Sequence, residues 1–102
     1  MRRFKHPNPV DIELTRVLYA LSDPVRLDVV RQLAAEGPAT CAALDGGRPK
    51  SSMSHHFRVL REAGVVTTTN EGASHMNELR RDELDKLFPG LLSSVLEEKK
   101  TR

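Results

Sequence analysis

The chain has 102 residues, of which 38% are hydrophobic and 29% are charged, with 16 Lys and Arg against 14 Asp and Glu. This length and mixture of charges suit one domain with a modest core, over residues 1–102 with flexible ends at about 1–8 and 98–102, and exclude a strongly charged disordered chain. No apolar run approaches the roughly 20 residues of a membrane span, and no apolar stretch follows the basic start as in a secretory signal. We therefore expect a cytoplasmic protein with no membrane partner.

The first half of the chain shows helical periodicity. Asn8-Pro9 predicts the start of a first helix, whose apolar stripe is Leu14, Val17, Leu18 and Leu21. Asp23-Pro24 can cap and start a second helix, which ends at Gly37-Pro38. Its apolar stripe is Leu27, Val30, Leu33 and Ala34. A short helix capped by Thr40 covers residues 41–44, and residues 45–49 read as a turn.

A further helix covers residues 51–63 and ends at Gly64, which suits a left-handed cap. The β-branched residues 65–69 then predict a strand, residues 70–72 a turn, and residues 73–79 a returning strand. Residues 82–87 are helical again, and a last apolar stripe comprises Leu91, Leu92, Val95 and Leu96. The order predicts a mainly α (α+β) fold, a winged helix-turn-helix with a two-stranded β-hairpin wing.

The helix at residues 51–63 has a buried face and an outward face of unusual composition. On a helical wheel Met53, Phe57 and Leu60 share the apolar side. The outward side chains are Ser51, His55, Arg58 and Glu62, flanked by Ser52 and Ser54. Serine forms helix less readily than the usual exposed residues, so a serine-rich first turn indicates a surface that approaches a partner closely.

DNA fits this face. Ser51 and Ser52, with the free amides of the first turn, can bind phosphate, while His55 and Arg58 can reach base edges. Between residues 48 and 61 the chain carries four basic residues and no acidic one; they are Arg48, Lys50, Arg58 and Arg61. The polar wing-tip residues Thr69, Asn70 and Glu71 are short enough to contact a minor groove. We expect phosphate attraction to be concentrated on this helix.

Residues 21–27 (LSDPVRL) and 51–66 (SSMSHHFRVLREAGVV) resemble the two signature blocks of the ArsR/SmtB family of bacterial transcriptional repressors. The resemblance implies a homodimer formed through the first and last helices, and operator binding by the helix at Ser51 and by the wing. The predicted DNA-binding residues are Lys50, Ser51, Ser52, Ser54, His55, Arg58, Arg61, Thr69 and Asn70. The predicted function is repression at a near-palindromic operator.

The sensing sites that the resemblance would imply are missing. Metal-responsive members carry paired cysteines on the short helix or Asp and His on the last one, whereas this chain has only Cys41 and no His or Cys after His75. We expect no metal site and no cofactor, with Cys41 a small buried thiol rather than a sensor, His56 structural, and His6 and His75 solvated. A site shared between two chains remains open.

Two alternatives to a self-contained repressor remain. An enzyme is not one of these alternatives. Ser54 and His55 are neighbours on a helix and point about 100° apart, so they form no catalytic pair, and we expect no enzymatic activity. The chain could instead be a winged-helix adaptor that binds a protein, although such a surface favours apolar or aromatic anchors. It could also be a DNA-binding subunit whose signal comes from a second protein.

Overall fold

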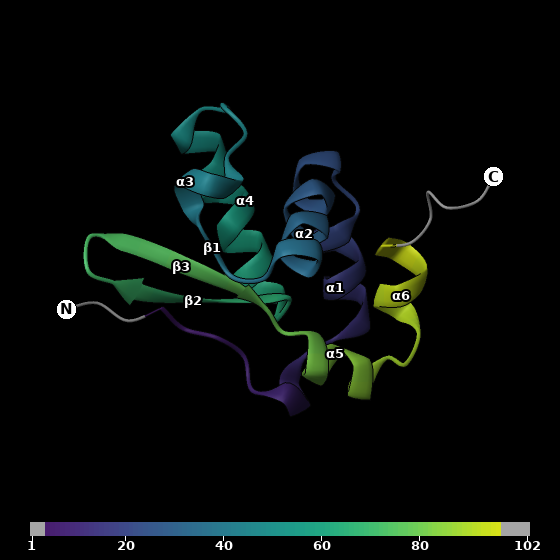
Figure 1. Ribbon diagram of the computed structural model, residues 1–102. Coiled ribbons are helices and arrows are strands. Elements are labelled where there is room, and N and C mark those ends of the chain that lie inside the picture. Colours follow the sequence, from purple (N-terminus) through teal and green to yellow (C-terminus); the bar gives the residue numbers. More distant parts are fainter. Residues whose placement is uncertain (1–3, 97–102) are drawn as a thin grey trace.

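The computed structural model describes residues 4–96 (Figure 1). Its elements in chain order are η1 (Pro9–Asp11), α1 (Leu14–Leu21), α2 (Pro24–Glu36), β1 (Ala39–Thr40), α3 (Cys41–Leu44), α4 (Lys50–Ala63), β2 (Val66–Glu71), β3 (Ser74–Leu79), α5 (Arg81–Leu87) and α6 (Leu91–Leu96). This order confirms the predicted mainly α winged helix-turn-helix. The wing, formed by β2 and β3, and helix α6 lie at opposite ends of the molecule (Figure 1). Within residues 4–96, every helix is too short or too polar to cross a bilayer.

The sheet has three antiparallel strands in the order β1-β3-β2, one more than the predicted hairpin. β1 is only two residues long and pairs Ala39 with Asn77 and Thr40 with Met76. Two residues are too few to show an alternating pattern, and they become a strand only because the free edge of β3 lies beside them.

The hairpin turn lies later than residues 70–72, where the sequence predicted it. Strands β2 and β3 stay paired to their ends, with Asn70 opposite His75 and Glu71 opposite Ser74. Gly72, with φ +63°, takes the positive dihedral of the reversal. Because the turn is formed by residues 72 and 73, β2 continues two residues further than predicted, to Glu71, and β3 begins one residue later, at Ser74.

Local capping fixes three helix ends where the sequence predicted them. The Asp23 carboxylate accepts hydrogen bonds from the amides of Val25 and Arg26, at 2.9 and 3.1 Å, and thereby starts α2. The Thr40 hydroxyl accepts from the Ala43 amide and starts α3. Gly64 ends α4 with φ +87°. Each of these features depends on side chains within a few residues, so periodicity and caps were sufficient to predict it.

The first helix begins later than predicted. Asn8 and Pro9 start only the single turn η1, without a side-chain cap, and Ile12 is extended before α1 begins at Leu14. Ile12 is buried, and a Cβ on Gly64 would lie 2.7 Å from its Cγ1. The chain leaves the helical path because this close packing against Gly64 places Ile12 in the core.

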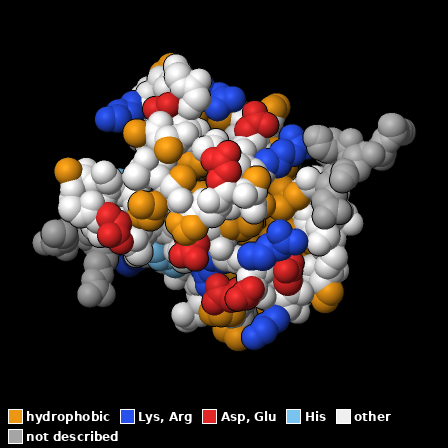
Figure 2. Space-filling model, in the orientation of Figure 1, with side chains coloured by type: hydrophobic (Ala, Val, Ile, Leu, Met, Phe, Trp, Pro, Cys, Tyr) orange, Lys and Arg blue, Asp and Glu red, His pale blue; other side chains and the backbone are white. Residues whose placement is uncertain are grey.

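The core lies between α1, α2, α4 and the sheet. Met53, Phe57 and Leu60 are buried, as predicted for one face of α4. On α2 the prediction was partly wrong, because Ala34 is exposed, whereas Val29 and the charged residue Arg26 are buried. On the face drawn in Figure 2, hydrophobic side chains emerge between charged ones. The large hydrophobic residues that remain exposed in the described chain are Val10, Leu14, Leu18, Tyr19 and Leu87.

Candidate nucleic-acid interface

Helix α4 presents six of the nine predicted DNA-binding residues to solvent. Its apolar residues are buried on one side, so the remaining positions face outward together. The exposed residues are Lys50, Ser51, Ser52, Ser54, His55 and Arg58. The Ser52 hydroxyl donates a hydrogen bond to the Pro49 carbonyl oxygen at 3.0 Å, so it is already engaged within the first turn of the helix. The other side chains of this set form a polar surface from the first turn of the helix to Arg58.

The positive charge of this segment is less concentrated than the sequence predicted. Arg48 lies 3.5 Å from the Asp28 carboxylate and donates to the carbonyl of Asp45. Within residues 4–96, Lys50 and Arg58 have no ion pair. Two of the four basic residues, Lys50 at the start of α4 and Arg58 in its middle, therefore remain available to an anionic partner.

Arg61 does not lie on the open face. Its guanidinium carbon is 4.5 Å from the centroid of the Phe4 ring, a cation–π contact. Burial lowers the pKa of Arg61 from its ordinary value. Arg61 extends the basic run and was therefore predicted to bind DNA, but the N-terminal segment covers it, a contact that leaves no local signal in the sequence.

Thr69 and Asn70 are exposed on the wing, as predicted, but they lie in β2 and not in its turn. They pair with Met76 and His75 on β3, and the tip itself is formed by Gly72 and its neighbour. The wing therefore presents Thr69 and Asn70 from a paired strand, which holds their backbone more rigidly than a loop would.

The N-terminal segment packs against the wing, which sequence analysis did not predict. The His6 Nε2 accepts a hydrogen bond from the Thr68 amide at 3.0 Å, so the expectation of a solvated His6 was wrong. The Phe4 ring meets His75 edge-on with centroids 5.0 Å apart, and Arg80 donates to the Pro7 carbonyl at 2.9 Å. Burial lowers the pKa of His6, and the charges of Arg80 and Arg61 lower it further. These contacts join residues about 60 or more positions apart, which leave no local signal.

A buried arginine connects the end of α1 to α4. Arg26 donates from Nε to the Ala20 carbonyl at 2.8 Å, from Nη2 to the Tyr19 carbonyl at 3.2 Å, and lies 3.2 Å from His56 Nδ1 through Nη1. His56 is thus structural, as predicted, and burial lowers its pKa while Asp23 opposes that shift. The sequence did offer a signal for this role of Arg26: Pro24 has no N–H to donate to the Ala20 carbonyl, so that carbonyl needs a side-chain donor.

Cys41 lies at the edge of the interface. It is half-buried, and its Sγ accepts from the Asn77 amide nitrogen at 3.2 Å, so it is less buried than the sequence predicted. Nowhere in residues 4–96 do three or more His, Cys, Asp or Glu side chains come together in a way that could hold a metal ion.

Comparison with known proteins gives the family. The helix-turn-helix domain family matches residues 21–69. An uncharacterized HTH-type transcriptional regulator of Bacillus subtilis, YceK, is 31% identical over 78% of this chain and 83% of its own. The arsenical resistance operon repressor of Staphylococcus xylosus is 34% identical over 78% of this chain and 77% of its own.

A solved structure supports the fold. The homodimeric winged helix-turn-helix DNA-binding domain Mb0332 of Mycobacterium bovis, a possible ArsR-family regulator, superposes with a TM-score of 0.65 at 22% identity, over 87% of this chain and 86% of that one. The signature blocks, the winged fold and the identity to these regulators agree, and the chain belongs to the ArsR family of helix-turn-helix transcriptional regulators.

Proposed function

We propose that the protein is a transcriptional repressor that binds a near-palindromic operator as a homodimer, with α4 in the major groove. The observation that carries the proposal is the exposed polar face of α4, which lies opposite a buried apolar face in a chain of this family. The adaptor alternative would favour apolar anchors on this surface, whereas the side chains described above as its outward set are all polar.

Each group on this face has a suitable partner on DNA. Arg58 is exposed and without an ion pair in the described chain, and it can donate two hydrogen bonds to the O6 and N7 atoms of guanine. His55 can reach a neighbouring base, while Lys50 and Ser51 at the helix start suit phosphate. Thr69 on the wing would contact the adjoining backbone or minor groove.

The dimer would form through α1 and α6. Leu14 and Leu18 on α1 are 43% and 44% exposed, and Leu91 and Val95 on α6 are half-buried. Burial of this apolar surface against a second copy would stabilise the dimer. Binding to successive major grooves would require this dimer to hold its two copies of α4 about 34 Å apart. The homologous fold from Mycobacterium bovis is homodimeric.

The experiment begins by selecting binding sequences from a random library with the purified protein. Arg58→Ala should then weaken binding to the selected operator by about 1–3 kcal/mol and relax the preference at one base position. Arg81→Ala on α5, which removes an arginine paired with Asp85, is the matched control and should leave the preference intact. Unchanged affinity in Arg58→Ala would mean that another face reads the DNA.

The dimer is tested by sedimentation. At micromolar concentration the protein should have about twice its chain mass of 11.4 kDa. Leu18→Glu, which places a charge on the exposed stripe of α1, should give a monomer with weakened operator binding. A wild-type monomer that still binds one operator tightly would contradict the dimer.

A further inference from the structure

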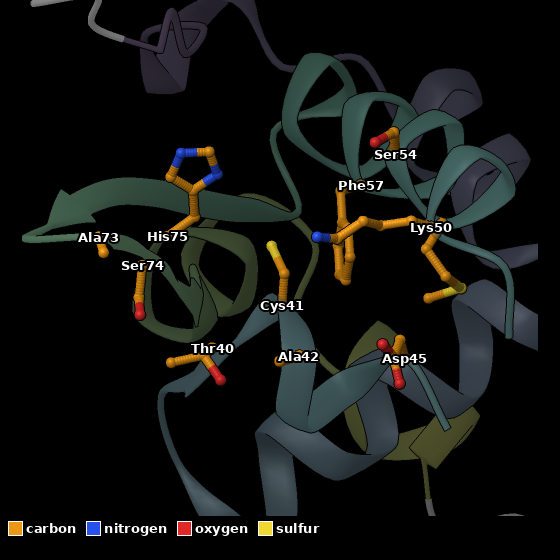
Figure 3. Close-up of a pocket in the computed structure, with 11 residues that line it drawn as sticks. Thr40, Cys41, Ala42, Asp45, Lys50, Ser54, Phe57, Ala73, Ser74 and His75 are labelled. Atoms are coloured by element: carbon orange, nitrogen blue, oxygen red, sulfur yellow. The ribbon is translucent and has the colours of Figure 1, made fainter. Parts of the chain in front are cut away.

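A cavity of about 350 Å³ lies between α3, α4 and the end of β3 nearest the wing tip (Figure 3). The base contacts proposed for Arg58 and His55 do not involve this cavity. Its apolar wall is formed by Met53 and Phe57 of α4 and by Cys41 and Ala42 of α3, and the Ser54 hydroxyl and His75 lie at its border. This volume is at the lower end of the about 300–1,000 Å³ that small-molecule sites occupy.

One cation extends into this space. The Lys50 side chain runs across the cavity, and its ammonium group points toward Phe57 and Cys41 (Figure 3). Within residues 4–96, Lys50 takes part in no hydrogen bond or ion pair through its side chain. An ammonium group beside an apolar wall, without a protein partner, is a place where a small anion would be held by a charge-assisted hydrogen bond.

The other charged groups near the cavity are of both signs. Asp45 is the acidic residue of the cavity wall; its Oδ1 accepts a hydrogen bond from the Gly47 amide at 3.0 Å, but that neutral donor does not cancel the carboxylate charge, so an anion would bind on the Lys50 side of the cavity. The Arg61 guanidinium lies within electrostatic range of Cys41, and it adds positive potential on that side of the cavity. The apolar wall and the unpaired ammonium together suit a small organic anion with an apolar body.

We propose that this cavity binds such an anion, of the aromatic carboxylate class, and that the bound anion competes with DNA for Lys50. The competition rests on the proposed function, in which Lys50 contacts phosphate at the start of α4. An anion held by Lys50 would withdraw that charge from the DNA and add a negative charge between the reading helix and the wing. Operator affinity would fall as a result.

Cys41 supplies a reporter of occupancy, because it is the single cysteine of the chain and it lines the cavity. The experiment measures the rate of Cys41 alkylation by neutral iodoacetamide, with benzoate or its uncharged analogue benzamide present and DNA absent. Benzoate should slow alkylation in a saturable manner and should bind about tenfold more tightly than benzamide, as expected for one charge-assisted hydrogen bond. Equal protection by both compounds, or protection by neither, would overturn the proposed site.

Two variants assign the charge. Lys50→Met should remove the preference for benzoate over benzamide, whereas Lys86→Met, a matched change at an exposed lysine of α5, should keep it. Circular dichroism checks that both variants are folded. A benzoate preference that survives in Lys50→Met would refute the role of Lys50.

The effect on DNA is measured separately, by titrating the selected operator with and without saturating benzoate. We expect the apparent Kd to rise about tenfold with benzoate and to change little with benzamide. Protection of Cys41 with no change in operator affinity would refute the competition. A protein that binds no selected DNA would refute the proposed function, while the alkylation rates would still decide whether the cavity binds the anion.

Discussion

Replacing Arg26 by methionine tests the link between α1 and α4. Arg26 is 5% exposed, and its guanidinium serves the carbonyls at the end of α1 and the imidazole of His56 on α4. Methionine retains most of the apolar length of arginine and removes every donor. The variant therefore isolates the hydrogen bonds from the packing of the side-chain stem.

The magnitude follows from which acceptors lose a donor. In a continuous helix the Ala20 carbonyl would accept a hydrogen bond from the backbone N–H of residue 24, but residue 24 is proline and has no N–H. Without Arg26 this carbonyl would therefore have no donor, which costs about 1–3 kcal/mol. The Tyr19 carbonyl keeps the amide and hydroxyl of Ser22 and costs little. The lost bond from a charged group to His56 adds about 1.5–3 kcal/mol. We expect the free energy of unfolding to fall by about 3–5 kcal/mol, a large share of the about 5–15 kcal/mol of a typical domain.

The assay is urea denaturation followed by circular dichroism at one fixed protein concentration. Arg16→Met is the matched control, because Arg16 is 63% exposed and pairs with Glu13 at 3.8 Å on the surface. Its effect should stay below about 1 kcal/mol. If Arg26→Met unfolded within about 1 kcal/mol of this control, the assignment of Arg26 as the donor that joins α1 to α4 would be wrong.

Three further predictions concern other parts of the molecule. The free energy of unfolding should fall as the pH is lowered from 7.5 to 5.5. The folded state lowers the pKa of His6 and of His56, so below about pH 6.5 the unfolded chain binds more protons than the folded one. The midpoints of urea denaturation at pH 7.5 and pH 5.5 check this, and equal midpoints would contradict it. Gly64→Ala should lower the free energy of unfolding by about 2–3 kcal/mol, since φ is +87° and the new Cβ would clash with Ile12. Gly90→Ala, with φ +86° and open space around the Cβ, should lower it by only about 1–2 kcal/mol. Equal losses in the two variants would show that the clash with Ile12 contributes nothing. Zinc and nickel should leave operator affinity unchanged, and a tight site coupled to about tenfold weaker binding and abolished in Cys41→Ser would refute this.

The sequence by itself determined the features that depend on near neighbours. Asp23 followed by Pro24 starts α2, and Gly64 ends α4, because caps and positive dihedrals are satisfied within a few residues. The helical spacing of Met53, Phe57 and Leu60 also settled which side of α4 is buried, and therefore which side is open to solvent. The outward face of α4 and the order of the helices and the wing strands follow from this local chemistry.

Tertiary structure alone decided which of the polar residues remain available. Arg61 belongs to the basic run in sequence, yet Phe4 covers it, and His6 leaves solvent to accept a hydrogen bond from the wing. Arg26 is buried within an otherwise amphipathic helix because α1 and α4 bring acceptors to it from both sides. Each of these outcomes depends on a partner from another element, and the energy of such a contact depends on the distance in space. Periodicity reports only the spacing along the chain.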